Sequence, residues 1–406
     1  MSDLPENWSL VTLSDVGVIT TGNTPPTKEK ENYGGTIPFV KPGDLDSSIP
    51  ITKTEQTLSK KGAQYARLLR TGTVLVSCIG NLGKIGIAGV PLATNQQINS
   101  IEFHPSLVHD RYGYYYCKTL KPWMEDEASA TTVTILNKGR FSLAPFALAP
   151  LDEQKRIADK LDSLLARVGQ CQTHLDRLPH LLKAFRQSVL AAATSGRLTD
   201  EWREENSVIG DWRLVKLSDV ATSRLGKMLD AAKNRGELRP YLRNINVRWF
   251  DFDLNDIQQL RISDDEARTL TVRKGDVLVC EGGEPGRCAV WHGENDAFLF
   301  QKALHRIRVG EKLTPEWVSY NLKTAADSGI LADYFTGTTI KHFTGISLSQ
   351  FELYLPTIAE QHEIVRRVER LFAFAERIET RWRAAQGQVS ALTPSLLAKA
   401  FRGELV

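Results

Sequence analysis

The sequence predicts an α+β fold, with two similar mixed α/β domains separated by a long antiparallel coiled coil of two helical regions and pseudo-two-fold symmetry overall. Three observations predict this fold. Residues 8–16 recur at 212–220 with seven of nine positions identical. Each copy is followed by short apolar runs between Gly, Pro and Thr residues, which are typical of strands and turns. Each of these segments then leads into a heptad repeat of apolar residues, which is typical of a coiled-coil helix.

The repeat is a duplicated domain with its connector rather than an array of short units. The two copies are offset by 204 residues from Trp8 to Trp212, and by 207 residues from Gly196 to Gly403. Solenoid repeats are only about 20–50 residues long. We therefore expect a first domain over 1–150, a first helical region over 151–204, a second domain over 205–356 and a second helical region over 357–406.

Apolar runs predict the frame shared by the two domains. Residues 73–76 and 85–88 have the pattern of buried strands between turns. Residues 112–120 have the pattern of a short helix. We interpret Trp8 and Trp212 as core anchors of the first strand in each domain, not as platforms on which a base stacks.

The helical regions are predicted from apolar residues that alternate in steps of four and three over four heptads. The seam of the first helix is Ile157, Leu161, Leu164, Val168, Cys171, Leu175, Leu178, Leu182, Phe185 and Val189. The seam of the second helix is Ile364, Val368, Leu371, Ala375, Ile378, Trp382, Ala385, Val389, Leu392 and Leu396. Pro179 and Pro394 are expected to kink each helix or to break it into two.

Pairing the two helices with each other buries both seams. An antiparallel pair also lets the first helix deliver the chain to the second domain. At 1.5 Å per residue, about 35–40 helical residues make a rod of roughly 50–60 Å. We therefore expect the two domains at opposite ends of a rigid spacer.

Bulk composition is that of an ordinary folded protein, with 42% hydrophobic and 24% charged residues. The sequence has no apolar run of the ~18–20 residues that cross a membrane, and no secretory signal at its start. We therefore expect no membrane contact. The five scattered cysteines form no Cys-x-x-Cys pair, so we expect reduced thiols and a cytoplasmic location. The net charge of +3 is compatible with nucleic-acid binding but does not require it.

The sequence contains no recognisable catalytic or metal-binding motif. Residues 80–84 have two residues between their glycines, where a phosphate-binding P-loop has four. Residues 23–26 match the Asn-Pro-Pro-aromatic motif of amino-methyltransferases only superficially, because Thr24 displaces the Asn and Thr27 replaces the aromatic residue. The histidines lack metal-ligand spacing and there is no Gly-x-Ser-x-Gly turn. We expect a binding protein with no catalytic residue, metal or cofactor of its own.

Polar and basic loops between the predicted strands are the candidate DNA contacts. Asn, Gln and Arg side chains read base edges, while Lys and Arg also bind phosphates. Lys84 and Arg287 stand in matching turns of the two domains. The candidates are Lys28, Lys30, Lys84, Asn95, Gln96, Gln97, Lys138 and Arg140 in the first domain, and Lys233, Arg235, Arg243, Asn244, Arg287, Gln301, Lys302, Lys341 and His342 in the second.

Over essentially all of its length the chain resembles the specificity subunits of type I restriction-modification systems. The resemblance rests on the order and duplication of several motifs together with the two heptad helices. The motifs are Trp-x-Leu-Val-x-Leu-Ser-Asp-Val at Trp8 and Trp212, Gly-x-Val-Leu-Val at Gly72 and Gly275, a proline followed by Glu-Gln at Pro150 and, with one extra residue, at Pro356, and the final residues 400–406.

The resemblance implies that each domain reads one half of an asymmetric, interrupted double-stranded DNA target. It implies that the helical rod sets the number of unread base pairs and docks two modification subunits. Those subunits would bind S-adenosylmethionine and methylate an adenine flipped out of the duplex. Two restriction subunits that use ATP and Mg²⁺ complete the implied assembly. The alternative reading is a stand-alone DNA-binding regulator or architectural protein, which would bind specific DNA tightly as a lone chain.

Overall fold

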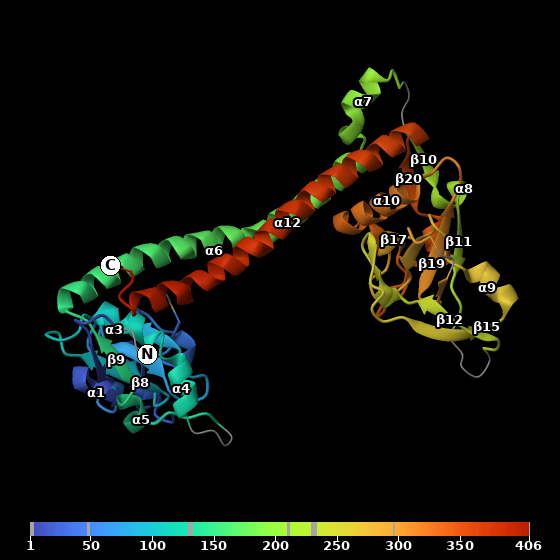
Figure 1. The fold of residues 1–406 in the computed structure, drawn as a ribbon. Coiled ribbons are helices and arrows are strands. Elements are labelled where there is room, and N and C mark those ends of the chain that lie inside the picture. The colour runs from blue at the N-terminus through green and yellow to red at the C-terminus, as the bar shows by residue number, and fades with distance from the viewer. Residues whose placement is uncertain are drawn as a thin grey trace. The chain divides into compact units, whose positions relative to one another are not determined.

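The computed structural model of this chain describes residues 4–46, 49–128, 133–208, 212–228, 234–294 and 297–405. The chain forms two compact units, one of residues 1–176 with 383–406 and one of residues 177–382. Each unit contains a domain and part of each of two long helices, α6 (Leu151–Thr194) and α12 (Ile358–Ala400) (Figure 1). The predicted α+β fold with two similar domains and two long helices is confirmed.

The first domain consists of short strands and helices. In chain order they are β1 (Ser9–Thr12), α1 (Leu13–Val16), β2 (Gly17–Thr21), η1 (Lys30–Asn32), β3 (Tyr33–Val40), η2 (Pro42–Asp44), β4 (Thr57–Leu58), α2 (Lys60–Ala63), β5 (Val74–Ser77), β6 (Ile85–Ile87), β7 (Ala93–Thr94), β8 (Ile98–Phe103), α3 (Asp110–Cys117), α4 (Lys121–Glu127), α5 (Lys138–Ser142) and β9 (Pro145–Leu148). The main sheet is antiparallel with strand order β2-β8-β5-β6. A smaller sheet has the order β4-β3-β7, and β1 pairs with β9.

The second domain repeats this plan. Its elements are η3 (Arg197–Thr199), α7 (Asp200–Glu205), β10 (Arg213–Lys216), α8 (Leu217–Val220), β11 (Ala221–Leu225), β12 (Glu237–Leu242), η4 (Asn244–Asn246), β13 (Val247–Arg248), β14 (Asp251–Phe252), β15 (Gln258–Ile262), α9 (Asp264–Leu270), β16 (Val277–Cys280), β17 (Cys288–Val290), β18 (Leu299–Phe300), β19 (Leu304–Val309), α10 (Pro315–Ser328), η5 (Ile330–Tyr334), α11 (Gly345–Ser349) and β20 (Glu352–Leu355). Its main sheet has the order β11-β19-β16-β17 and its smaller sheet the order β15-β12-β18. As in the first domain, the first and last strands, β10 and β20, pair with each other.

The first strand of each domain is anchored by its tryptophan, as predicted from the repeat. Trp8 is buried and its ring lies edge-on to Tyr112 at 6.3 Å between centroids. Trp212 is half-buried and lies edge-on to the fully buried Trp317 at 5.4 Å. Tyr112 and Trp317 therefore fill the same place in the two cores.

The two long helices pack antiparallel within each unit. In the first unit, Ile157 near the start of α6 shares a hydrophobic core with Leu397 near the end of α12. In the second unit, Val189 near the end of α6 shares a core with Ile364 near the start of α12. The predicted seam residues differ in burial. The buried ones are Ile157, Leu161, Leu182, Val189, Ile364, Val368 and Ala375. The half-buried ones are Leu164, Val168, Leu175, Leu178, Phe185, Leu371, Ile378, Trp382, Ala385, Val389 and Leu396, and Cys171 and Leu392 are exposed.

Neither proline breaks its helix, so of the two expected outcomes, a kink or a break into two helices, the break is wrong. Pro179 lies inside α6 and Pro394 inside α12. An interior proline costs a helix about 3 kcal/mol. Both prolines are exposed, and around Pro179 the packing of half-buried Leu178 and buried Leu182 offsets that cost. No helix among the described residues combines the length and apolar content that a membrane crossing requires.

Candidate nucleic-acid interface

The turn between β5 and β6 and the turn between β16 and β17 have the same backbone geometry. In the first turn, the amide of Ser77 donates to the carbonyl oxygen of Lys84 at 2.9 Å, and in the second the amide of Cys280 donates to Arg287 at 2.8 Å. Lys84 and Arg287 therefore occupy the same place in the two domains. Each turn is shaped by two glycines with positive φ, a region that other residues rarely adopt. These glycines are Gly80, Gly83, Gly283 and Gly286.

In the second domain, candidate residues from four loops converge on Gly282. Asn244 donates a long hydrogen bond from Nδ2 to the carbonyl oxygen of Gly282 at 3.4 Å, and its own carbonyl oxygen accepts one from Arg287 at 2.9 Å. A side chain at Gly282 would meet the ring of His342, whose Nδ1 lies 3.5 Å from the position of a Cβ. Gln301 follows β18, and Ala303 in the same loop accepts a hydrogen bond from the amide of Glu281, the neighbour of Gly282, at 2.9 Å. The structure thus brings these candidates together on one edge of the domain.

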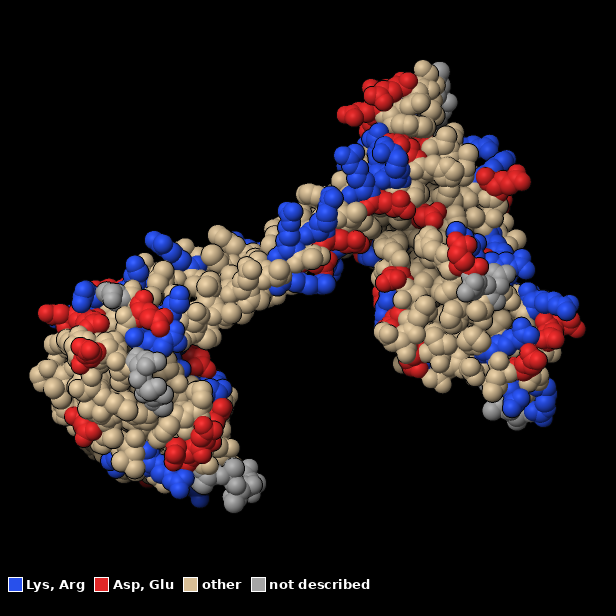
Figure 2. All heavy atoms as spheres, viewed as in Figure 1, with Lys and Arg blue, Asp and Glu red and all other residues tan. Residues whose placement is uncertain are grey.

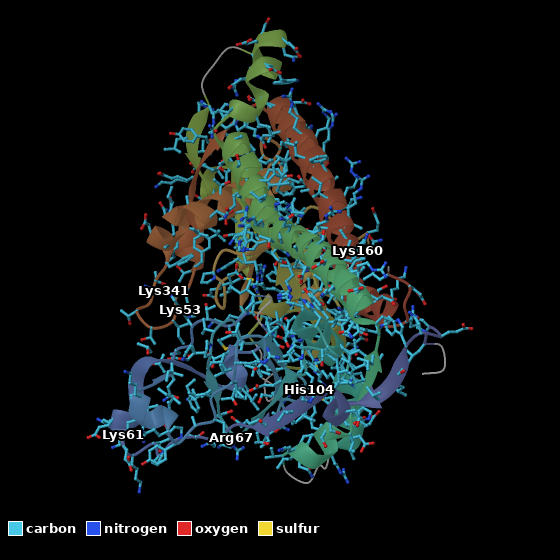
Figure 3. All side chains as sticks on the ribbon, turned by 90° about the vertical axis from the view of Figure 1, so that its left-hand side faces the viewer. Lys53, Lys61, Arg67, His104, Lys160 and Lys341 are labelled. Atoms are coloured by element: carbon cyan, nitrogen blue, oxygen red, sulfur yellow. The ribbon has the colours of Figure 1, made fainter. Side chains whose placement is uncertain are left out.

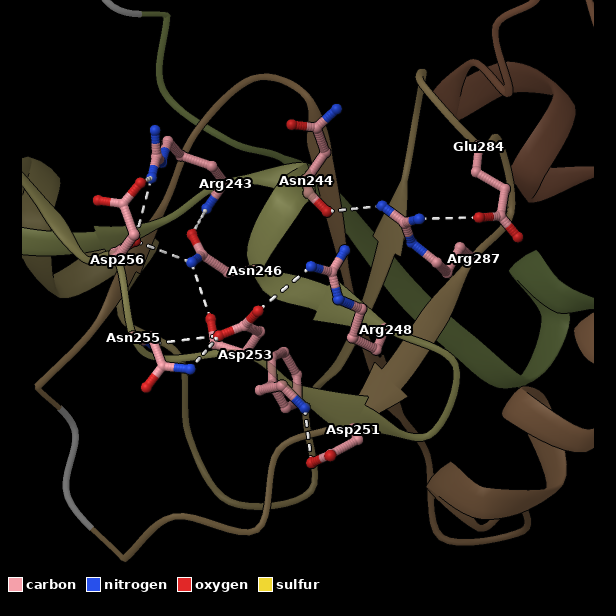
Figure 4. A network of polar contacts seen from close by, with 11 residues as sticks. Arg243, Asn244, Asn246, Arg248, Asp251, Asp253, Asn255, Asp256, Glu284 and Arg287 are labelled. Carbon is pink, nitrogen blue, oxygen red and sulfur yellow. Dashed lines mark hydrogen bonds and ion pairs between the residues drawn. The ribbon is translucent and has the colours of Figure 1, made fainter. Parts of the chain in front are cut away.

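Carboxylates hold the arginines of this edge in fixed positions (Figure 4). The pairs are Arg243 with Asp256 at 2.6 Å, Arg248 with Asp253 at 3.2 Å and Arg287 with Glu284 at 2.8 Å. The hydrogen bond from Arg243 holds the pKa of Asp256 below its usual value. The side chain of Arg287 is only 15% exposed. An incoming phosphate or base edge must therefore supplement or displace a carboxylate to reach these guanidinium groups.

A buried asparagine anchors the loop that carries two of these pairs. Asn246 accepts a hydrogen bond from the amide of Arg243 at 2.9 Å and donates to the carbonyl oxygens of Asp253 and Asp256 at 2.9 and 3.0 Å (Figure 4). Because all three contacts are to backbone atoms, Asn246 fixes the path of the loop whatever side chains it presents.

In the first domain, the polar loop after β7 is held by its own side chains. Asn95 is buried and donates from Nδ2 to the side-chain oxygen of Gln97 at 2.9 Å. Gln96 is exposed and accepts a hydrogen bond from the hydroxyl of Thr24 at 2.5 Å. Gln96 is therefore the member of this group that presents its side chain to solvent.

Lys84 has an acidic partner whose position is taken by an aromatic residue in the second domain. Its Nζ lies 3.7 Å from Asp46. Asp46 and Phe250 stand at matching places: both have positive φ, and their amides donate to the carbonyl oxygens of Ile85 and Cys288. The two domains thus share the backbone at this turn but differ in the side chains around its basic residue.

The remaining candidates that the structure describes are solvent-exposed. Arg140 donates to the carbonyl oxygen of Glu127 at 2.7 Å, and Arg235 makes only a long contact with the carbonyl oxygen of Asn234 at 3.4 Å. Lys233 lies outside the described residues. The other exposed candidates are Lys28, Lys30, Lys138, Lys302 and Lys341, the last of which is labelled in Figure 3.

Four further residues near these loops were not among the candidates predicted from the sequence. In the second domain, exposed Arg248 is followed by Trp249, whose Nε1 donates to Glu284 at 2.8 Å. In the first domain, exposed Arg67 (Figure 3) donates to the carbonyl oxygen of Thr21 at 2.6 Å, and Tyr65 accepts a hydrogen bond from Asn23. The available signal was a basic residue within two positions of an aromatic one in the sequence, as in Arg248-Trp249 and Tyr65-Ala66-Arg67.

The side chains at the Gly282 edge of the second domain are suited to binding nucleic acid. Lys and Arg are interspersed with Asp and Glu over the second domain in the view of Figure 2. Within the described ranges, no group of three or more His, Cys, Asp or Glu residues is arranged to hold a metal ion. The edge offers amide, guanidinium and imidazole groups, which are hydrogen-bonding partners for base edges and phosphates.

Comparison with known sequences finds one family twice in this chain. A family profile described as the type I restriction modification DNA specificity domain matches residues 5–175 and 209–384. The type I restriction enzyme EcoKI specificity subunit of Escherichia coli K12 is 26% identical over 99% of this chain and 90% of its own length. The EcoBI specificity subunit of Escherichia coli is 28% identical over 98% of this chain and 86% of its own length.

Two solved structures share the fold of the whole chain. A chain from a study of complex assembly and conformational transition in a type I R-M system aligns with a TM-score of 0.76 at 19% identity, over 100% of both chains. The HsdS subunit of Thermoanaerobacter tengcongensis aligns with a TM-score of 0.66 at 18% identity, over 99% of this chain and 98% of its own.

Proposed function

This chain belongs to the type I restriction-modification DNA specificity family, and from that premise we propose that its two domains read the two halves of one interrupted double-stranded DNA target. The resemblance in sequence is thereby confirmed. Membership makes the chain a DNA-recognition subunit and not a catalyst. Its relatives are specificity subunits of restriction enzymes, and the chemistry of such an enzyme belongs to other subunits.

One observation carries the proposal of two separate half-sites. The domains share a backbone frame but present different side chains at matching positions around the β5–β6 and β16–β17 turns. Lys84 is replaced by Arg287, and Asp46 is replaced by Phe250. A shared frame with different side chains is the expected result when one scaffold reads two different base sequences.

In the second domain, we assign direct reading to the edge around Gly282. Asn244 and Gln301 carry the amides that pair with adenine, and Arg287 carries the fork that pairs with guanine. Hydrogen bonds hold Asn244 and Arg287 in place, which favours recognition because little side-chain entropy is lost when the DNA arrives. In the first domain, Lys84 matches Arg287, and Asn95 matches Gln301 but is buried, so we assign direct reading there to Lys84 and to the neighbouring exposed Gln96.

We propose that α6 and α12 set the distance between the half-sites. Each helix is continuous over more than forty residues, and each packs antiparallel against the other within its unit. Continuous paired helices resist bending, so their length fixes the number of base pairs that are passed over unread.

We propose that the partners are two modification subunits and two restriction subunits, in the cytoplasm. S-adenosylmethionine would bind to the modification subunits and ATP with Mg²⁺ to the restriction subunits, so this chain needs no cofactor of its own. Its contribution is to bind DNA and to place an adenine within reach of the methyltransferase.

Selection of binding sites from random DNA tests this function. The complex of this chain with its modification subunit is used to enrich random duplexes, which are then sequenced. We expect two short fixed blocks separated by a gap of constant length. A single continuous block would contradict the two-domain account. Enrichment of specific DNA by the lone chain, with equal affinity, would favour a stand-alone regulator.

A further inference from the structure

The duplication makes each domain an internal comparison for the other. Gln154 of α6 accepts a hydrogen bond from the amide of His109 at 2.9 Å, and Gln361 of α12 accepts one from the amide of Thr314 at 2.8 Å. His109 and Thr314 are the residues that precede helices α3 and α10. These bonds align α3 with α10 and α6 with α12, residue by residue.

In the first unit, a guanidinium group lies between α3 and α6. Arg111 donates from Nη2 to the hydroxyl of Tyr115 at 3.1 Å and to the carboxylate of Asp162. Its Cζ lies 5.5 Å from the centroid of the Tyr115 ring, and the Tyr115 hydroxyl also donates to Asp162. One cation therefore contacts the carboxylate, the hydroxyl and the aromatic face of this site together.

In the second unit, a carboxylate replaces this cation. The alignment pairs Arg111 with Glu316, Tyr115 with Tyr320 and Asp162 with Glu369. Tyr320 is 6% exposed, and within the described part of the chain its hydroxyl has no hydrogen-bond partner. Glu316 and Glu369 form no ion pair with any described residue. The second site therefore keeps a tyrosine hydroxyl and a carboxylate at the places of Tyr115 and Asp162. It gains a carboxylate at the place of Arg111 and so lacks the guanidinium donor.

These groups line a cavity of about 230 Å³ between β17, α10 and α12. Aromatic rings form its walls, since the Phe250 centroid lies 5.8 Å from that of Tyr320 and 6.0 Å from that of Phe372. Glu376 adds a third carboxylate from the same face of α12, and exposed His292 also lines the cavity. The cavity is therefore an aromatic cage with acidic groups around it.

The chemistry of the cage selects a cation with hydrogen-bond donors. Three carboxylates repel the phosphates of DNA, so this face does not serve the nucleic acid. A guanidinium group donates up to five hydrogen bonds and stacks on aromatic rings, which suits a site with free carboxylates, a free hydroxyl and aromatic walls. The first unit holds that same group at the matching place.

We propose that this pocket receives an arginine side chain of a modification subunit. The inference rests on the proposed function, which supplies a protein partner bound along the long helices. Two of the three carboxylates, Glu369 and Glu376, are exposed on α12, so a partner that lies on this helix reaches them without opening the domain. Nothing in the described part of the chain competes for the pocket.

The test uses a substitution that places an arginine in the second unit at the position of Arg111 in the first. Glu316→Arg places a guanidinium from the chain itself between Tyr320 and Glu369, as Arg111 is placed between Tyr115 and Asp162. We expect this variant to unfold at the same temperature as the wild type but to bind the purified modification subunit at least 10-fold more weakly. Glu369→Gln removes one carboxylate without filling the pocket and should weaken binding about 5–10-fold.

Glu352→Gln is the matched control, because Glu352 is exposed on β20 and lies outside the pocket. It should bind as the wild type does. If both pocket variants bind the modification subunit within two-fold of the wild type, the proposal is overturned. If spermidine or Mg²⁺ binds the lone chain and Glu369→Gln abolishes only that binding, the site is one for small cations and the proposal is also overturned. A wild-type chain that forms no complex contradicts the proposed function instead.

Discussion

Glu360 accepts a hydrogen bond from the indole Nε1 of Trp212 at 3.0 Å, across 148 positions of sequence. Glu360 is 1% exposed, and its other oxygen accepts from Arg203 at 2.7 Å and Thr199 at 2.8 Å. This carboxylate ties the start of α12 to the segment after α6 and to the first strand of the second domain. The matching indole nitrogen of Trp8 is buried and has no hydrogen-bond partner among the described residues.

Replacing Glu360 should therefore destabilise the second unit. Glu360→Ala leaves the indole nitrogen of half-buried Trp212 without an acceptor and removes one of the two carboxylates that pair with Arg203, the other being Asp200, which should cost about 1–3 kcal/mol of unfolding free energy. Glu153→Ala is the matched control in the first unit, where that carboxylate accepts only a 3.2 Å bond from exposed Asn7, and should cost less than about 1 kcal/mol. Denaturant unfolding of both variants measures the difference, and equal losses would contradict this role for Glu360.

Stability should also fall in acid because of Glu363. Hydrogen bonds from Arg366 and then Arg367 lower the pKa of Glu363 to about 2. A carboxylate with a lowered pKa stabilises the fold above its unfolded value and loses that contribution as the pH falls toward the folded value. We expect Glu363→Gln to lower stability at pH 7 by about 0.5–1 kcal/mol, and the gap from the wild type to close between about pH 4.5 and pH 2. A gap that is unchanged at pH 2 would show that Glu363 is not the titrating group.

The carboxylate that holds Arg287 should restrain DNA binding. Glu284→Gln removes a charge that competes with phosphate, so we expect DNA affinity of the assembled complex to rise about two- to five-fold. Arg287→Ala should lower affinity and reduce the salt slope by about one. Fluorescence anisotropy over a salt series measures both effects.

Lys84→Ala is the control from the matching turn of the first domain. It should affect recognition of the other half-site only. Variants at Lys84 and Arg287 that alter the same half-site would contradict one domain per half-site, and an unchanged affinity in both would show that these turns do not contact DNA.

The length of the helices should determine the spacer. Seven residues inserted into both α6 and α12 add about 10 Å of helix while keeping the heptad register. The unread gap should grow by about three base pairs, at 3.4 Å per base pair, with both half-sites unchanged. Site selection with the altered complex reads out the gap, and a gap of the original length would contradict a ruler made of these helices.

The frame of each domain was predictable from sequence because it depends on local patterns. The repeated Trp-x-Leu-Val segment marks the first strand, and the heptads mark the helices that bury Ile157 and Ile364. The candidate interface was predictable only as a set of loops. The structure shows that Glu284 holds Arg287 and that Asn246 anchors the loop of Arg243. Both are side-chain contacts, which the periodic pattern of apolar residues does not predict.

The pocket beside α12 was hidden from sequence for the same reason. Glu316, Tyr320 and Glu369 lie on two helices, and their shared site emerges only when the hydrogen bonds of Gln154 and Gln361 align the two copies. The outcome for the prolines has a different origin. The rule that proline ends a helix is a local preference, and the burial of seam residues on both sides of Pro179 outweighs it.

A map of methylated adenine tests the central claim most directly. The chain is co-expressed with its modification subunit, and the host DNA is sequenced by a method that detects modified adenine. The account predicts one interrupted motif, with a short block of fixed bases on each side of a gap of constant length. A continuous motif, or no methylated motif despite a stable complex between the two proteins, would contradict it.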